Sequence, residues 1–288
     1  MVIALLAVSV VSFLTLTCRS GGGNYLFLVD NLYAVADSIE DDRKIDLPRG
    51  GRADIEVVRD LGNPVPEMRK ALEGRYSRVL VSPYLFEAAE SLASEYPETF
   101  FGLMRYGAPE AGEGGGNTAS LVLDRSEAVT ALAGRIAAEV DPGGGGTHIL
   151  GVWRAVSAED REELELFREA LSADSGGRFS VEIRPVGEAP DFGELEIFIR
   201  EELTADTVLG LCFAGPVNVS CARVFWEYGI PVASEGLPSP EHVWGPVAFT
   251  VFHDPRAVFE EFLSLDAAEN LPPAVIGASI APSGGSGS

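Results

Sequence analysis

Polar and aromatic residues that could hold a small molecule stand where short apolar runs end. Asp30 and Asn31 follow the run YLFLV, and Glu235 follows VAS. A carboxylate at such a position can accept hydrogen bonds from sugar or ribose hydroxyls, and an aromatic side chain can stack on a ring. A cleft with a few fixed polar groups and flat faces suits a small ligand. The candidate ligand-binding residues are Asp30, Asn31, Ser82, Tyr84, Tyr106, Trp153, Arg154, Phe213, Gly215, Asn218 and Glu235.

Some of these residues have a purely structural alternative. Phe213 ends an apolar run and could belong to a core, and the same holds for Trp153. Arg154 could pair with a surface acid, because the chain is strongly acidic. Asp30 is the strongest candidate, since it ends an apolar strand at the edge where parallel sheets bind their ligands.

Catalytic and metal-binding patterns do not occur in this sequence. It contains no G-x-S-x-G, G-x-x-x-x-G-K-[ST] or H-E-x-x-H motif, and its glycine runs lack the spacing of a dinucleotide loop. The three cysteines, Cys18, Cys212 and Cys221, form no CxxC pair, which zinc sites commonly use. Cys212 and Cys221 could form a disulfide or remain buried thiols. We expect a protein that is not an enzyme and uses no metal or cofactor.

The charge of the chain narrows the choice of partners. Its 288 residues carry 44 acidic and 21 basic side chains, a formal net charge of −23. Such a field repels phosphate backbones, so nucleic acid is excluded as an expected partner. Hydrophobic residues make up 46% of the chain, which is enough for a folded core.

Apolar runs alternate with amphipathic runs from Asn24 onward. The expected strands are Tyr25–Val29, Asp54–Val58, Arg78–Val81, Phe100–Met104, Thr147–Val152, Phe179–Ile183 and Thr207–Phe213. The expected helices are Pro66–Glu73, Leu85–Glu95, Ser126–Glu139, Ala158–Leu171, Phe192–Glu202 and Val219–Tyr228, and Asp254 should cap a further helix that begins at Pro255. This alternation predicts βαβ units and parallel sheets.

The alternating pattern occurs twice, over residues 24–106 and 147–234, with Gly-rich segments at 107–116 and 141–146. Two doubly wound units in one chain predict two lobes that face a cleft. Because ligands bind beyond the carboxyl ends of parallel strands, the candidate residues should lie at the mouth of that cleft.

The amino end has the features of an export signal. Residues 2–17 form an uncharged run of 16, shorter than the ~20 residues of a spanning helix and close to a signal-peptide core. No Lys or Arg precedes this run. Leu14-Thr15-Leu16-Thr17 before Cys18 resembles the lipobox of bacterial lipoproteins, with Thr at the position before the cysteine. The resemblance implies a signal peptide over 1–17, lipidation of Cys18 and a tether over 18–23; alternatively, Cys18 is an ordinary signal-peptide residue.

Four stretches, in this order, resemble a known family. They are NYLFLVD; NTASL followed by EAVTALAGRIAAEV; LGLCFAGPVN followed by ARVFWEYGIPVASEG; and VWGPVAFTVFHDPRAVFEEFL. Together they are similar to type I solute-binding proteins, in particular the basic membrane protein lipoproteins of ABC importers, which resemble purine nucleoside receptors. Three features depart from that family. The first loop reads Asp30-Asn31-Leu32-Tyr33-Ala34, where the family usually has Asp-Asp followed by a Ser-Phe-Asn motif. The AFTVFHD stretch has no Lys, and Ala214-Gly215-Pro216 replaces a Gly-Gly pair.

The resemblance implies an α/β fold of two doubly wound parallel-sheet lobes joined by a hinge, the periplasmic binding protein-like I fold. It implies a first lobe over 24–118 and 250–280, a second lobe over 119–249 and a flexible tail over 281–288. The implied function is a monomeric, lipid-anchored protein on the outer side of a bacterial membrane. It would bind a nucleoside or sugar-like ligand between the lobes and deliver it to an ABC permease. The alternative, which the departures favour, is a sensor or protein-interaction lipoprotein of the same fold without a transport role.

Overall fold

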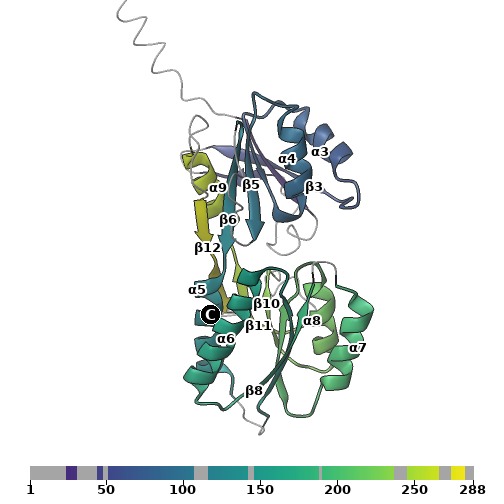
Figure 1. Cartoon of the computed structure of the whole chain (residues 1–288), viewed down its shortest axis with the longest axis vertical. Coiled ribbons are helices and arrows are strands. Elements are labelled where there is room, and N and C mark those ends of the chain that lie inside the picture. The colour runs from purple at the N-terminus through teal and green to yellow at the C-terminus, as the bar shows by residue number, and fades with distance from the viewer. Residues whose placement is uncertain are drawn as a thin grey trace, which may run out of the picture.

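The computed structural model describes residues 24–30, 44–47, 51–106, 116–141, 146–187, 190–236, 245–265 and 274–282. The expected signal peptide, Cys18, the tether, Asn31 and the tail from Ser283 onward lie outside these residues. The described chain forms two lobes, one above the other in Figure 1, and each lobe is built on one sheet. The helices are α3 (Val65–Leu72), α4 (Phe86–Ala93), α5 (Ser126–Glu139), α6 (Ala158–Ser175), α7 (Phe192–Glu202), α8 (Asn218–Glu227) and α9 (Pro255–Ser264), with short 3-10 helices η2 (Pro83–Leu85) and η3 (Gly215–Val217).

The two sheets share the same order of five central parallel strands. In space, the first sheet consists of β12 (Ala274–Gly277), β6 (Thr118–Asp124), β5 (Phe100–Tyr106), β4 (Arg78–Val81), β1 (Tyr25–Asp30), β3 (Arg52–Val58) and β2 (Lys44–Asp46). The second consists of β13 (Ser279–Pro282), β11 (Val247–Phe252), β10 (Val232–Glu235), β9 (Thr207–Phe213), β7 (His148–Arg154) and β8 (Ser180–Val186). Only β2 and β13 are antiparallel to their neighbours among these strands.

Each lobe therefore has a topological switch point. Five parallel strands run β3-β1-β4-β5-β6 in one lobe, where β12 adds a sixth beside β6, and β8-β7-β9-β10-β11 in the other. The chain therefore reverses its winding direction beside β1 and beside β7. Ligands of doubly wound sheets bind at this point, beyond the carboxyl ends of the strands. The expected fold class is confirmed, and the repeated order explains the repeated sequence pattern.

The apolar strands are buried on both faces, as the sequence predicts. In β1, Leu26 and Leu28 pack with α3 and α4, while Phe27 and Val29 pack with α9. Side chains alternate across a strand, so a strand covered on both faces must be apolar throughout. Helix α9 thus completes the first lobe although it comes late in the chain (Figure 1). Asp254 caps it as expected, since its carboxylate accepts the Arg256 N–H at 2.9 Å.

Three crossings join the lobes. The chain leaves the first sheet after β6 and enters α5 at Arg125, returns between β11 and α9 at His253, and crosses again between β12 and β13 at Ala278. The carbonyl oxygen of Asp124 accepts the Ala278 N–H at 2.8 Å and lies 3.2 Å from His253 Nε2. One backbone oxygen therefore contacts all three crossings.

These crossings lie elsewhere than the boundaries expected from the sequence at 118/119, 249/250 and 280/281. Residues 118–124 form β6 in the first sheet, and residues 247–252 form β11 in the second. The stretch expected as a returning strand therefore belongs to the second lobe, and only α9 after it returns. Pro282 pairs with Phe249, so part of the expected tail is strand β13. The physical reason is that a chain crosses between elements, because a strand must pair along its length within one sheet.

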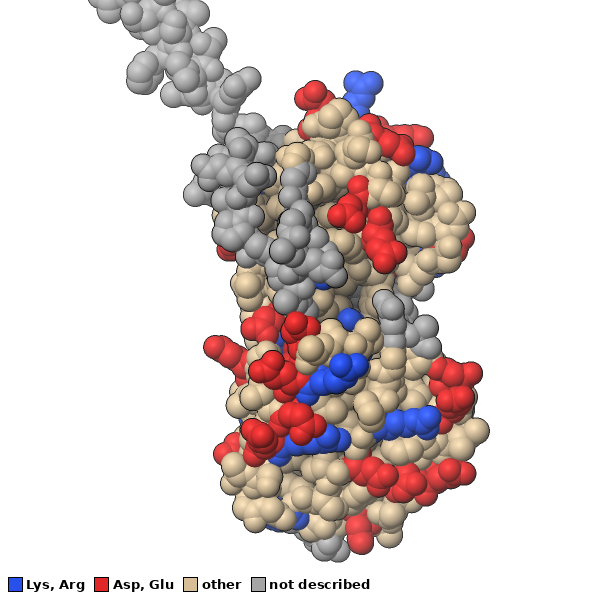
Figure 2. Space-filling view, in the orientation of Figure 1, with Lys and Arg blue, Asp and Glu red and all other residues tan. Residues whose placement is uncertain are grey.

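The surface carries the acidic excess of the composition. Figure 2 shows Asp and Glu side chains on both lobes, with Lys and Arg mostly beside acids on the lower lobe. Ion pairs join several arginines to acids in the second lobe, such as Arg200 to Glu227 at 2.6 Å. Within the described ranges, every helix is too short or too polar to cross a membrane.

Candidate ligand site between the two lobes

The switch point of the first lobe holds a buried acid and a buried hydroxyl. Asp30 ends β1 and Ser82 follows the neighbouring strand β4, and neither is exposed to solvent. Ser82 Oγ donates to Asp30 Oδ2 at 2.6 Å and accepts the Asp30 N–H at 2.9 Å. This pair of bonds joins the carboxyl ends of the two central strands. Both residues were predicted from their strand-end positions, and the structure brings them together.

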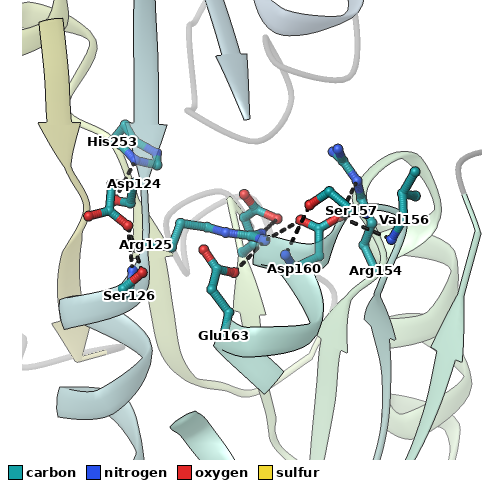
Figure 3. Close-up of polar contacts among 10 residues, drawn as sticks. Asp124, Arg125, Ser126, Arg154, Val156, Ser157, Asp160, Glu163 and His253 are labelled. Atoms are coloured by element: carbon teal, nitrogen blue, oxygen red, sulfur yellow. Dashed lines mark hydrogen bonds and ion pairs between the residues drawn. The ribbon is translucent and has the colours of Figure 1, made fainter. Parts of the chain in front are cut away.

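In the second lobe, an arginine at the first crossing lies among three acids (Figure 3). Arg125 follows β6 and is 2% exposed. Its Nη1 donates to Glu235 Oε2 at 2.5 Å, and its Nη2 donates to Glu163 Oε2 at 2.8 Å. The same Nη2 lies 3.7 Å from Asp160 Oδ1. A planar guanidinium with five donors suits such divided contacts, which an ammonium could not reproduce.

A local sequence signal fixes Asp160. Ser157 and Asp160 form a capping box at the start of α6, in which Ser157 Oγ accepts the Asp160 N–H at 3.0 Å. Asp160 Oδ2 in turn accepts the N–H groups of Val156 and Ser157, each at 3.0 Å. The Nε of Arg154, at the end of β7, lies 3.6 Å from that oxygen. The helix start therefore holds a carboxylate between two arginines.

Glu163, one turn further along α6, is the acid of this group whose charged form is disfavoured by burial. Its carboxylate is nearly buried, and burial raises its pKa above the ordinary value. The neighbouring carboxylates of Glu235 and Asp160 raise the pKa further, while the Arg125 guanidinium lowers it. Burial outweighs the ion pair, because a carboxylate loses more hydration than one shared cation restores.

The carboxylate of Glu235 has one oxygen bound to Arg125 and one oxygen without a hydrogen bond among the described residues. Its Oε2 accepts from Arg125, while its Oε1 is buried and has no hydrogen-bond partner among the described residues. The backbone around it is held by Asn218, whose amide donates to the Glu235 carbonyl at 3.0 Å and accepts the Ala214 N–H at 2.5 Å. Asn218 therefore ties the ends of β9 and β10 together, and its role in this structure is to position Glu235.

Two tyrosines of the first lobe reach the second. The ring centroid of Tyr106 lies 5.5 Å from the guanidinium carbon of Arg125 and 5.2 Å from that of Arg154. The hydroxyl of Tyr84 lies beside Gly215, where an added Cβ would come within 2.5 Å of it. Gly215 also has a φ of +63°, which favours glycine. These contacts place both tyrosines, and Gly215, in the gap between the lobes.

Charged groups of both lobes shift the pKa of the Tyr84 hydroxyl. Its pKa is raised above the ordinary value, first by burial and then by the carboxylate of Glu235. Asp30 raises the pKa further, and the guanidiniums of Arg154 and Arg125 lower it. Charged groups of both lobes thus lie near enough to the Tyr84 hydroxyl to shift its pKa.

Trp153 and Phe213, expected as stacking surfaces for a ligand, lie in the core of the second lobe. Neither has exposed surface, and their rings stack at a centroid distance of 4.3 Å and an angle of 13°. The ring of Phe167 from α6 packs on Trp153 at 5.3 Å. Strand side chains alternate, so Arg154 points to the opposite face from Trp153. Trp153 and Phe213 are therefore core residues, as the structural interpretation of the sequence allowed, and they do not provide a ligand surface.

Sequence reasoning missed Arg125, Asp160 and Glu163. The capping pattern S-x-x-D at 157–160 was visible, but it indicates only a helix start. Arg125 stands between a strand and a helix with no signal for burial. His253 lies at the second crossing; it is 5% exposed, and burial lowers its pKa. Within the described part of the chain, no group of three or more His, Cys, Asp or Glu is placed to hold a metal ion.

Comparisons with known proteins identify the fold. No protein-family model and no curated protein matches the sequence. An ABC transporter solute-binding protein from Conexibacter woesei is 15% identical, with a TM-score of 0.61 over 90% of this chain and 88% of that one. A carbohydrate transporter solute-binding protein from Agrobacterium radiobacter, in complex with D-arabinose, is 13% identical, with a TM-score of 0.54 over 92% and 95%. A transcriptional activator of the comK gene from Bacillus halodurans is 15% identical, with a TM-score of 0.56 over 91% of each chain. The chain thus has the periplasmic binding protein-like I fold.

Proposed function

We propose that this protein is an extracytoplasmic solute-binding lipoprotein of an ABC importer, which binds a nucleoside or a sugar-like ligand between its lobes. One observation carries the proposal: polar side chains at the strand ends of both sheets lie where the two lobes meet. Asp30 and Ser82 stand at the switch point of the first lobe, and Arg154 at that of the second, with Glu235 two strands away from it. Doubly wound sheets bind ligands at such points.

The hinge would convert binding into a signal. A ligand that touches both lobes favours the closed arrangement only through the extra contacts that it makes there. The three crossings meet at the carbonyl oxygen of Asp124, so the lobes can rotate about a small region without disturbing either sheet. The closed form would be recognised by a membrane permease.

The same proposal covers location and partners. Residues 1–17 would be a signal peptide, and Cys18 would become the lipidated first residue of a monomer tethered on the outer side of the membrane. Two solved structures of the same fold bear names that describe transporter solute-binding proteins, and one of them holds D-arabinose. These names support a sugar-like ligand. The sequence likeness to nucleoside-binding lipoproteins supports a nucleoside.

Calorimetric titration tests the binding function. The purified protein, without its signal peptide, is titrated with a panel of monosaccharides, polyols and nucleosides. We expect at least one compound to bind with a dissociation constant of about 1 μM or below, equivalent to about −8 kcal/mol. Absence of heat from every compound would contradict the proposal.

A second candidate function is a sensor or protein-interaction lipoprotein of the same fold. The contacts of Tyr84 and Tyr106 favour it, because side chains of the first lobe already pack on the second. One solved structure of this fold bears the name of a transcriptional activator, which is compatible with such a role. The genes adjacent to this one distinguish the candidates: permease and ATPase genes favour transport, and a histidine kinase gene favours sensing.

A further inference from the structure

The three crossings between the lobes meet at a titratable side chain. His253, at the second crossing, is buried, and its Nε2 lies 3.2 Å from the carbonyl oxygen of Asp124 at the first crossing (Figure 3). The same oxygen accepts the Ala278 N–H of the third crossing at 2.8 Å. The imidazole ring therefore lies at the small region about which the lobes would rotate.

The contact with Asp124 fixes the proton on this ring. A carbonyl oxygen only accepts hydrogen bonds, so Nε2 of His253 is the donor and carries the hydrogen of the neutral imidazole. Protonation would place a second hydrogen on Nδ1 and a positive charge on the ring. Such a charge is costly in a buried position unless acidic groups compensate it.

The charged groups that face the ring compensate it only in part. Burial lowers the pKa of His253, and the guanidinium of Arg125 lowers it further. The carboxylates of Glu235, at the end of β10, and of Asp124 raise it, but by less in total. Both acids are engaged elsewhere, since Glu235 Oε2 accepts from Arg125 and Asp124 Oδ1 accepts the Ser126 N–H at 2.9 Å. The neutral ring is therefore the form that suits this arrangement.

The other segments beside the ring leave this balance unchanged. The third crossing, residues 277–279, is uncharged. The acid that follows His253 in the chain, Asp254, caps α9 by accepting the Arg256 N–H at 2.9 Å. Protonation of the ring is thus governed by its burial and by Glu235, Asp124 and Arg125.

We propose that His253 makes the hinge sensitive to acid, because protonation of its ring favours separation of the two lobes. Asp124 belongs to the first sheet and Glu235 to the second, so rotation of the lobes changes the surroundings of the ring between them. In this structure the lobes are in contact through Tyr106 and Arg125. Lobes further apart would return water to the ring and bring its pKa towards the ordinary value of about 6.5.

The direction of the effect follows from proton linkage. The separated arrangement has the higher pKa at His253, so it holds the proton more tightly than the arrangement in contact. Contact between the lobes is therefore fully favoured above about pH 6.5 and is weakened as the pH falls below that value. A difference of one pKa unit would change the ratio of the two arrangements by up to about tenfold. A ligand held by both lobes would be released on acidification; this consequence rests on the function proposed above.

Glu163 responds to acid in the opposite direction and must be separated from His253. Burial raises the pKa of Glu163, so acid favours the arrangement in which its carboxyl group is buried. Two variants separate the groups. His253→Gln keeps a side-chain N–H that can donate to the Asp124 carbonyl but takes up no proton, and Glu163→Gln leaves the response of His253 unopposed.

Distances between spin labels test the proposal without a ligand. Labels at Glu90→Cys on α4 and Glu201→Cys on α7, in a chain with Cys18→Ser, report the separation of the lobes away from the crossings (Figure 1). Between pH 7.5 and pH 5, we expect the population with the longer distance to grow at least twofold more in the wild type than in His253→Gln.

A second histidine provides the matched control for this experiment. His148 lies at the start of β7, where its Nδ1 is 3.1 Å from Ser180 Oγ, and His148→Gln should respond to pH like the wild type. Equal responses in the wild type and His253→Gln would overturn the proposal. So would an unchanged distance in Glu163→Gln, which decides the matter even if His253→Gln does not fold. Thermal unfolding at both pH values establishes which variants are folded.

Calorimetry extends the test to the ligand. For the compound that binds most tightly to the wild type, we expect the affinity to fall at least fivefold more between pH 7.5 and pH 5 in the wild type than in His253→Gln. Equal falls would contradict the role of His253 and leave the proposed function intact. No binding by any compound at either pH would contradict the proposed function, while the label distances would still decide the role of His253.

Discussion

The ring centroid of Tyr106, at the end of β5 in the first lobe, lies 5.5 Å from the guanidinium carbon of Arg125 at the first crossing between the lobes. This contact connects Tyr106 of the first lobe to Arg125 and the acids that pair with it, Glu163 and Glu235. A guanidinium over an aromatic ring contributes about 0.5–1 kcal/mol at an exposed site and more when desolvated. Closure of the lobes and the geometry of the acids around Arg125 are therefore linked through one side chain.

Arg125 should be essential to the stability of the second lobe. Replacing it with Met keeps much of the volume but leaves Glu163 and Glu235 buried without their cation. Breaking a buried ion pair from one side costs about 3–5 kcal/mol, and we expect a loss of this size in the free energy of unfolding, measured with urea. Arg135→Met serves as the control, since the Arg135–Glu139 pair is partly exposed on α5 and its loss should cost less than about 1 kcal/mol. Similar losses in the two variants would contradict this account of the site.

Gly215→Ala should impair the contact between the lobes. An added methyl group would come within 2.5 Å of the Tyr84 hydroxyl, and the left-handed backbone adds about 1–2 kcal/mol of strain. Gly176→Ala is a matched control, because Gly176 has a φ of +62° with open space around it. We expect a loss of stability in both variants, but weaker ligand binding only in Gly215→Ala. Restored binding in the double variant Gly215→Ala/Tyr84→Phe would confirm the clash, and normal binding by Gly215→Ala alone would rule it out.

Glu163 should make the stability depend on pH. Its pKa is raised in the folded protein, so the folded state holds this proton more tightly than the unfolded state does. The stability that this group contributes is present below its unfolded pKa of about 4.3 and is lost as the pH rises through the folded pKa. Glu163→Gln removes this titration. We therefore expect the difference in unfolding free energy between variant and wild type to shift in favour of the variant between pH 4 and pH 7. A difference that stays constant over urea titrations in this range would refute the prediction.

Cys212 and Cys221 should be unreactive thiols. Neither forms a disulfide in the described structure, and both are buried. Burial raises the pKa of Cys221 to about 12 and also raises that of Cys212. Because the thiolate is the reactive form, iodoacetamide at pH 8 should label neither in the native protein and both after unfolding. Peptide mapping by mass spectrometry distinguishes them from Cys18. Failure to label them after unfolding without reductant would indicate a disulfide instead.

The sequence predicts the elements well because their signals are local. Arg78–Val81 and Thr207–Phe213 are strands with the expected bounds, since apolar residues on both faces suit strands covered by helices. Ser126–Glu139 and Phe192–Glu202 are likewise helices over the expected residues. The lobe to which a strand belongs is not determined by local sequence. The apolar residues of β11 suit either sheet, and only its pairing with β10 decides the matter.

The site could be predicted only in part, for a related reason. Asp30 and Glu235 are marked by their position at strand ends, which chain order reveals. Arg125 is buried because it pairs with acids 35 or more residues later in the chain. No local sequence pattern predicts these long-range ion pairs. The placement of Trp153 behind the strand ends likewise depends on Phe167 from a separate helix. Contacts between distant elements therefore determine which strand-end residues face a ligand.

In the proposed function, residues of both lobes hold one ligand. The dissociation constants of two single variants test this most directly. Tyr84→Phe changes the first lobe by one hydroxyl, and Glu235→Gln changes the second by one charge. For the compound that binds most tightly to the wild type, calorimetry should give an affinity at least tenfold weaker in each variant. The exposed Tyr228→Phe should bind like the wild type. Unchanged affinity in both site variants, or no binding by the wild type, would contradict the claim.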